Sequence, residues 1–171
     1  MVRKIMDMCC ECRGMTSLDL TPLDTSNLTG MDYMFSGCSG LTSLDLTPLD
    51  TSNVTGMDYM FSGCSGLTIL DMAGWNTSNV TSMEYMFKDC SGLTGLDLTP
   101  LYTSKVRSMS YMFSGCSGLT TLTTGPSFKF VGTYYNLRGT WQNTAGETFN
   151  GNIQRANFPS NVADTYTKRS S

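Results

Sequence analysis

The chain has 171 residues, is 40% hydrophobic and 15% charged, and carries a formal net charge of −3. Residues 15–118 hold ten acidic and three basic side chains, which argues against nucleic acid as a partner, because phosphate binding needs a basic surface. The apolar runs are too short for a transmembrane helix, and the absence of histidine removes the commonest general base and metal ligand.

Residues 1–14 resemble half of the repeat described below, so we assign them as a partial N-terminal repeat. Cys12 fits the cysteine column of that repeat, whereas Cys9 and Cys10 fall outside it, and their spacing matches no standard zinc motif. The segment lacks the continuous apolar core of a signal peptide. We therefore expect either a protein that stays inside the cell or a fragment of a longer secreted chain. The open N-terminal edge could support end-to-end self-association.

Four copies of one pattern follow without insertion or deletion, over residues 15–40, 41–66, 67–92 and 93–118. Their spacing is marked by Cys38, Cys64, Cys90 and Cys116, which lie 26 residues apart. A fixed period of roughly 20 to 50 residues is typical of proteins built from stacked repeats. The sequence therefore predicts a solenoid over residues 15–124, in which four full copies are followed by one last strand.

Two elements are expected within each copy. The first is a short parallel strand such as residues 44–46, in which Leu44 and Leu46 point inward and Asp45 points out. The second is a short helix, because apolar side chains recur at steps of three and four. In the second copy these side chains are Val54, Met57, Met60, Phe61 and Cys64. We therefore predict an α/β repeat solenoid, with one short strand and one short helix in each 26-residue turn.

The connecting segment of each copy, TPLDTSN in the second, holds polar side chains that can bond to the backbone of the adjacent turn. We expect its asparagines to form an amide ladder along the stack; they are Asn27, Asn53 and Asn79. The fourth copy departs from this pattern, because it carries Tyr102, Lys105 and Arg107 in the same region. A grafted binding site usually appears as one copy that differs from the rest, so these three residues are candidate binding residues.

Residues 125–171 have another composition, in which glycines and aromatic side chains are interspersed with polar ones. This pattern favours two or three β-strands, with turns at Asn143–Gly146 and Asn150–Asn152. Such a segment would cover the open end of the stack, whose last strand and core would otherwise face water. We therefore assign residues 125–171 as a β-rich C-terminal cap.

Three segments recur together at this spacing over roughly residues 2–124: LTSLDL, TSNVT and MxxMFxxCSGL. They resemble the leucine-rich repeats of BspA-like bacterial surface proteins, a type also described as a mycoplasma repeat of unknown function. The tail, with GTWQNTAGETF and FPSNVADTYTK, resembles the segment that follows such repeats in surface proteins of gut bacteria. The resemblance implies a leucine-rich-repeat-like solenoid displayed outside a bacterium. Some members are thought to act as adhesins, and the family brings no catalytic motif.

An aspartate column is expected on the exposed face of the strands, formed by Asp19, Asp45, Asp71 and Asp97. Carboxylates stacked about 5 Å apart repel one another, so the column needs turn hydrogen bonds, a basic partner or a cation to offset the repulsion. A calcium site needs about six to eight converging oxygens, and the neighbouring positions do not complete one; they hold Ser17, Ser43, Ile69 and Gly95. We rank a structural turn first, partner binding second and a cation third, and we predict no metal site.

Two further columns flank the predicted helix. The four repeat cysteines lie on its apolar face, where a reduced, buried thiol is the default. A tyrosine column lies beside the inward side chains and consists of Tyr33, Tyr59, Tyr85 and Tyr111. Its two interpretations are packing against the core and, as an exposed aromatic stripe, recognition of protein or glycan.

These observations together predict a bacterial interaction module. Without a histidine, no base stands ready to activate a nucleophile, so we expect no enzyme activity and no cofactor. We predict an adhesin-like, extracellular or cell-surface module, part of a longer secreted chain, that binds a host or bacterial surface protein or glycan through its solenoid face. Nucleic acid and membrane insertion are not expected. The alternative is a structural spacer with no ligand of its own, because copies this similar suit stacking better than a tailored site.

Overall fold

The computed structural model describes residues 3–4, 13–152 and 158–170. Within these ranges the strands are β1 (Arg3–Lys4), β2 (Leu28–Gly30), β3 (Gly95–Asp97), β4 (Thr121–Thr124), β5 (Thr140–Gln142), β6 (Thr148–Asn150) and β7 (Asp164–Lys168). β1 pairs in parallel with β2, and the other five strands form one mixed sheet in the order β3-β4-β7-β5-β6.

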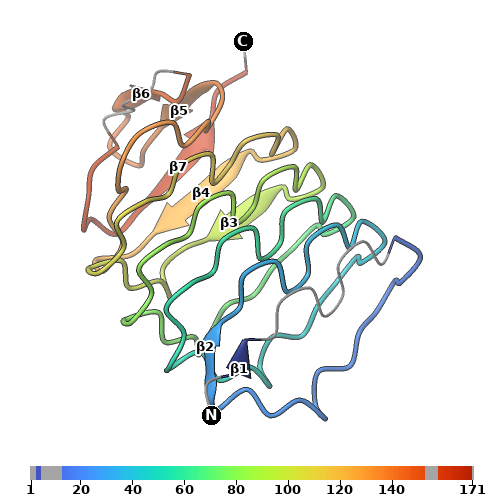
Figure 1. Ribbon diagram of the computed structural model, residues 1–171. Helices are drawn as coiled ribbons and strands as arrows, with labels where there is room; N and C mark the ends of the chain where they lie inside the picture. Colours follow the sequence, from blue (N-terminus) through green and yellow to red (C-terminus); the bar gives the residue numbers. More distant parts are fainter. Residues whose placement is uncertain (1–2, 5–12, 153–157, 171) are drawn as a thin grey trace.

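The four copies form successive coils that lie side by side along the molecule (Figure 1). Alternate backbone amides of one coil donate to carbonyls of the next coil. From the second copy these bonds run from Met57 to Ser82 (3.1 Å), from Tyr59 to Glu84 (2.9 Å) and from Phe61 to Met86 (2.9 Å). Equivalent bonds join the first coil to the second and the third to the fourth. Pairing between coils, rather than structure within one coil, therefore holds this side of the stack.

The prediction of an α/β solenoid with one helix in each repeat is wrong, because the described residues contain no helix. The segment expected to be helical is a run of tight turns, in which the amides of Met60 and Ser62 donate to carbonyls three residues earlier. Tyr59 within it has a φ of +57°, a left-handed conformation that a right-handed helix excludes. Alternate amides thereby point to the neighbouring coil instead of along the segment.

The apolar residues behind the helix prediction are nevertheless all in the core. Val54, Met57, Met60, Phe61 and Cys64 have no exposed surface. Successive turns of three residues return side chains to one side at steps of three, as a helix also does, so both backbones produce the same sequence pattern. The phenylalanines of consecutive coils stack with ring centroids 5.5, 5.9 and 6.2 Å apart, from Phe35 to Phe113.

The predicted strand of each copy is hydrogen-bonded as a strand only at the C-terminal end of the stack. There β3 pairs in parallel with β4, and Leu96 lies opposite Leu122. In the first three copies, residues 18–20, 44–46 and 70–72 belong to no strand. Leu44 and Leu46 still point inward, with 8% and 2% of their surface exposed. Burial of alternate leucines, rather than a continuous ladder, therefore orders this side of the early coils.

A buried threonine column joins the coils on a third side. Its members are Thr25, Thr51, Thr77 and Thr103. The hydroxyl of Thr77 accepts a hydrogen bond from the amide of Tyr102 at 2.7 Å and donates to the carbonyl of Tyr102 at 3.0 Å. Thr25 and Thr51 accept the amides of Asp50 and Asn76 in the same way, and Thr103 accepts the amide of Lys129 in the cap. Each threonine therefore links its coil to the segment packed on it.

The predicted amide ladder of asparagines is wrong in its partners. The side-chain amides of Asn53 and Asn79 donate at 2.8 Å to backbone carbonyls of the preceding coil, at Ser26 and Ser52. Because the amides reach the backbone of the previous coil, they do not bond to one another. Asn53 and Asn79 still link neighbouring coils through these side-chain to backbone bonds.

The C-terminal segment packs against the last coil. β7 pairs antiparallel with β4, which places Tyr166 opposite Leu122, and β5 and β6 extend the same sheet (Figure 1). The side chains of Tyr166 in β7 and Trp141 in β5 are buried. The edge of β4 that would otherwise be open is therefore covered by β7.

The N-terminal partial repeat is described only in part. β1 lies in parallel against β2, with Arg3 opposite Leu28, so residues 3–4 contact the first full copy. Cys9, Cys10 and Cys12, together with the open edge through which self-association was expected, lie outside the described residues.

Candidate functional site

The aspartate column forms a series of turns on the exposed face. Asp45 accepts hydrogen bonds from the amide and the hydroxyl of Thr47 at 2.9 and 2.7 Å, and Asp19 binds Thr21 in the same way. Asp71 and Asp97 each accept one amide, two residues later, at 2.8 Å. The threonine hydroxyls, followed by the amides, lower the pKa of the Asp19 and Asp45 carboxyls. One oxygen of each carboxylate thus stabilises the local turn.

A second acidic column, which the sequence analysis did not single out, lies half-buried beside the tyrosines. Asp32 accepts the amide of Asp58 at 3.0 Å, and Asp58 accepts the amide of Glu84 at 2.7 Å. Burial raises the pKa of Asp58, and the charges of Asp32 and Glu84 add to that effect. Asp32 and Asp58 therefore each accept the amide of the next coil, and Glu84 accepts the hydroxyl of Ser108, which gives the column a role in stacking. No group of three or more acidic, cysteine or histidine residues suited to a metal ion occurs in the described part of the chain.

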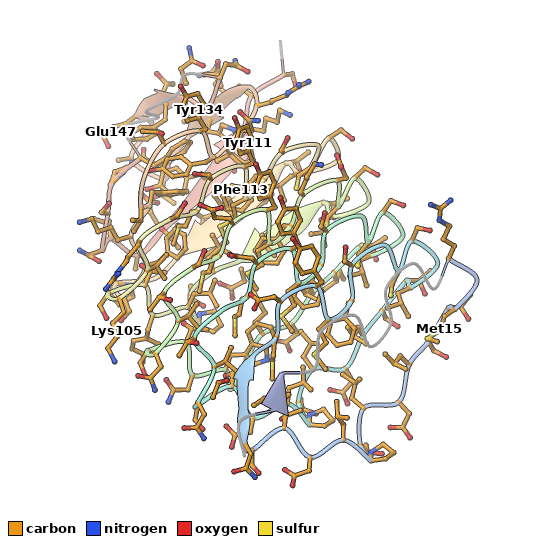
Figure 2. All side chains as sticks on the ribbon, viewed as in Figure 1. Met15, Lys105, Tyr111, Phe113, Tyr134 and Glu147 are labelled. Atoms are coloured by element: carbon orange, nitrogen blue, oxygen red, sulfur yellow. The ribbon has the colours of Figure 1, made fainter. Side chains whose placement is uncertain are left out.

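The tyrosine column is a continuous stack of rings. Centroids of consecutive rings from Tyr33 to Tyr111 lie 4.6, 4.4 and 5.1 Å apart, with interplanar angles of 7° to 11°. Tyr134 of the cap extends the stack, with its ring centroid 6.0 Å from that of Tyr111. Both residues are labelled in Figure 2. Burial raises the pKa of Tyr59 to about 12. Because both faces of Tyr59, Tyr85 and Tyr111 are covered by neighbouring rings, these rings present their edges and offer no flat platform for a sugar.

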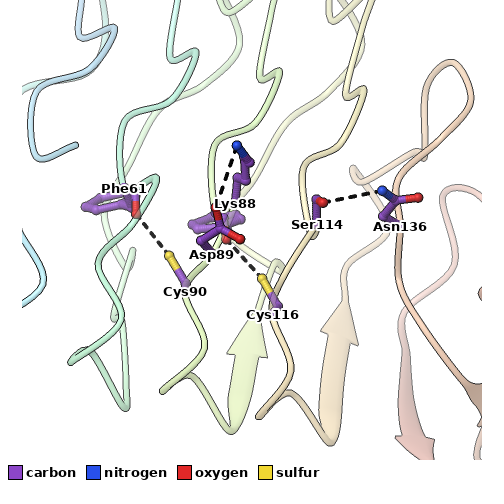
Figure 3. A network of polar contacts seen from close by, with 8 residues as sticks. Phe61, Lys88, Asp89, Cys90, Ser114, Cys116 and Asn136 are labelled. Atoms are coloured by element: carbon purple, nitrogen blue, oxygen red, sulfur yellow. Dashed lines mark hydrogen bonds and ion pairs between the residues drawn. The ribbon is translucent and has the colours of Figure 1, made fainter. Parts of the chain in front are cut away.

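The cysteine column is structural. The thiols of Cys64, Cys90 and Cys116 donate at 2.9 to 3.0 Å to phenylalanine carbonyls of the preceding coil, as drawn for the last two in Figure 3. None of these three cysteines forms a disulfide, as predicted. Burial raises the pKa of Cys64 and of Cys116 to about 12, so neither thiol is a ready nucleophile at neutral pH.

A groove of about 420 Å³ lies where the fourth coil meets the cap. Tyr102 forms one wall with half of its surface exposed. Polar groups come from both sides, with Ser104 from the coil and Ser127, Lys129 and Asn161 from the cap. Among the residues that line this groove there is no carboxylate.

The other two candidate residues of the fourth copy do not line this groove. The ammonium group of Lys105 donates to the side-chain oxygen of Asn79 at 2.7 Å, and Lys105 projects from the edge of the stack in Figure 2. The backbone amide of Arg107 donates to the carbonyl of Thr81 at 2.9 Å. Of the three candidates, Tyr102 therefore lines the groove. The cap residues beside it lie outside the repeat and could not be found by comparing the copies.

Comparison with protein families identifies the repeat region. Residues 3–124 match the family described as a Mycoplasma protein of unknown function, DUF285. The chain belongs to this family. A search of curated proteins found no match, and neither did a search of solved structures.

The DUF285 match covers the stacked coils and ends with β4. It supports the mycoplasma-type repeat named in the sequence resemblance, whereas the BspA-like assignment gains no support from it. The description as an α/β leucine-rich repeat is wrong, since the described coils of this DUF285 chain contain strands and turns alone. Within the described ranges, no helix has the length and apolarity needed to cross a membrane.

Proposed function

We propose that this DUF285 chain is a non-catalytic interaction module of a bacterial cell surface and that it binds a glycan in the groove between the fourth coil and the cap. The half-exposed ring of Tyr102 in that groove is the observation that carries the proposal. An aromatic ring with an exposed surface packs against the apolar side of a sugar ring. Hydroxyl and amide groups such as those of Ser127 and Asn161 bond to sugar hydroxyls.

Further support comes from the repeat itself. The position of Tyr102 holds Asp24, Asp50 and Asn76 in the other copies. The backbone amide at this position donates to a threonine hydroxyl of the preceding coil whichever side chain is present. Tyr102 makes this bond at 2.7 Å, and Asp50 and Asn76 make it at 2.7 and 2.8 Å. Stacking therefore does not require a tyrosine, and its presence beside a groove favours a role in recognition.

The test is a glycan array probed with the full chain and with two single variants. Tyr102→Asn places the residue of the third copy in the groove without changing the charge, and should reduce binding at least tenfold. Lys105→Asn restores the repeat residue outside the groove and serves as the matched control, which should bind as the wild type does. Both variants should unfold at the wild-type temperature, because neither change touches the core.

A structural spacer is the second candidate, favoured by the unbroken stacks of phenylalanine and tyrosine rings through all four coils. The same array distinguishes the two, since a spacer would bind no glycan in either form. A pull-down from extracellular-matrix proteins covers the remaining class of ligand. If a protein binds the wild type but not Tyr102→Asn, the groove remains the binding site and its ligand is a protein instead of a glycan.

A further inference from the structure

A second groove, of about 310 Å³, lies on the outer face of β3 and β4. Its floor is Gly95, with Ile69 from the third coil on one side and Thr121 from β4 on the other. Asp97 also lines it, and so does Thr123. The groove is formed by the strand side of the stack, whereas the groove at Tyr102 is formed by the connecting segment and the cap, so the two have no lining residue in common.

Two adjacent departures from the repeat create this groove. The corresponding position in the first two copies is serine, at Ser17 and Ser43, whereas the third and fourth copies have Ile69 and Gly95. An ideal Cβ on Gly95 would have its nearest contact, Thr121 Cβ, at 4.0 Å, and no left-handed φ requires glycine there. A serine would fit the backbone and the available space, so the fold does not explain why the side chain is absent.

Ile69 is equally unexplained by packing. It has 72% of its surface exposed, the largest value among the exposed large hydrophobic side chains of the described residues. A single exposed isoleucine is unremarkable on a protein surface, but this one lies at the rim of a hollow that the neighbouring Gly95 opens. The two departures together give an apolar wall beside a space that a side chain from another molecule can fill.

The surroundings of the groove are acidic. Asp71 follows Ile69 by two residues and Asp97 lines the groove, and both are exposed, each with one oxygen bonded to a backbone amide. The basic side chains of residues 15–118 are Lys88, Lys105 and Arg107, and none of them lines this groove. An apolar hollow flanked by unpaired carboxylates favours a ligand that is apolar at its centre and basic at its ends.

We infer that this face docks an extended basic segment of a partner protein, with one aliphatic side chain seated over Gly95 against Ile69 and flanking lysines or arginines paired with Asp71 and Asp97. A glycan fits this groove less well, because no aromatic ring lines it. Nucleic acid is excluded by the negative charge. The inference uses residues separate from the groove at Tyr102 and does not depend on glycan binding there.

The test uses the full chain, labelled with ¹⁵N, and the peptide Lys-Thr-Leu-Thr-Lys as the probe. Amide shifts should concentrate at residues 69–72, 95–97 and 121–123, and the affinity should fall at least fivefold when salt is raised from low to high concentration. Glu-Thr-Leu-Thr-Glu is the matched peptide control and should cause no saturable shifts. Equal binding of both peptides, or no saturable shift with the basic peptide, would overturn the inference.

Two variants locate the site, and each restores the serine of the first two copies. Gly95→Ser fills the hollow and Ile69→Ser removes the apolar wall, so each should weaken binding of the basic peptide at least tenfold. Because serine occupies this position in other coils, both variants should fold. If one of them fails to fold, the other still tests the site. Tyr102→Asn should leave peptide binding unchanged, which separates this site from the glycan groove. Wild-type affinity in both serine variants would refute the assignment.

Discussion

Replacing Thr77 by valine removes a hydroxyl from the buried threonine column while keeping the volume of the side chain. The hydroxyl accepts the amide of Tyr102 at 2.7 Å and donates to its carbonyl at 3.0 Å. Valine leaves both backbone groups without this partner, and an unsatisfied buried group costs about 1–3 kcal/mol. Since the amide loses its bonding partner and the carbonyl loses a donor, we expect Thr77→Val to lower the free energy of unfolding by about 2–3 kcal/mol.

The measurement is urea unfolding followed by the fluorescence of Trp75 in the stack and Trp141 in the cap, both of which are buried. Thr77→Ser is the matched control, because it keeps the hydroxyl and loses one methyl group, at a cost of about 1 kcal/mol. The expected order of stability is therefore wild type, then Thr77→Ser, then Thr77→Val. A valine variant as stable as the wild type, or more stable than the serine variant, would show that the column does not hold the coils together.

Three further substitutions test other columns. Phe61→Ala removes a fully buried ring that stacks on both neighbouring coils, and should cost about 3–5 kcal/mol in urea unfolding; a loss below about 1 kcal/mol would contradict the core assignment. Asp58 has a raised pKa, so its charged form opposes folding at neutral pH and the penalty disappears as the pH falls through the folded-state pKa. Asp58→Asn should therefore be more stable than wild type near neutral pH, with a difference that shrinks in acid; a difference that grows in acid would reverse the sign of the shift. Asp89 has a φ of +58° where the other coils have glycine, and Asp89→Gly should raise the free energy of urea unfolding by about 0.5–1 kcal/mol; a loss of stability would show that its exposed ion pair with Lys88 matters more than the strain.

The length of the repeat and the inward-facing residues could be predicted from the sequence, because apolar residues recur at the same positions in every copy. Burial selects apolar side chains whatever backbone carries them, so Met57, Met60 and Phe61 were assigned to the core correctly. The backbone itself could not be predicted in this way. The left-handed conformation of Tyr59 has no local signal, since tyrosine rarely adopts it, and only contacts with adjacent coils make it favourable.

The predicted bonds from the connecting segment to the backbone of the adjacent coil are confirmed, whereas the burial of the threonine column and the groove at Tyr102 were missed for different reasons. Threonine in a polar connecting segment looks like any turn residue, and its burial becomes visible only when the coils are stacked. The groove depends on Lys129 and Asn161, which come from outside the repeat, so no comparison among copies could place them beside Tyr102. Contacts between the stack and the cap are therefore the part of this molecule that the pattern of the repeat does not determine.

Some residues that depart from the repeat are explained by hydrogen bonds between coils, and others are not. Lys105 replaces an asparagine yet makes its own bond to the preceding coil through Asn79, so stacking alone accounts for it. Tyr102 makes the same backbone bond as the residues it replaces, Ile69 is exposed, and a Cβ on Gly95 would meet nothing closer than 4.0 Å. A side-chain change that no hydrogen bond between coils uses requires another cause. These three residues also lie at the groove beside the cap and the groove over β3 and β4, where a ligand would supply that cause.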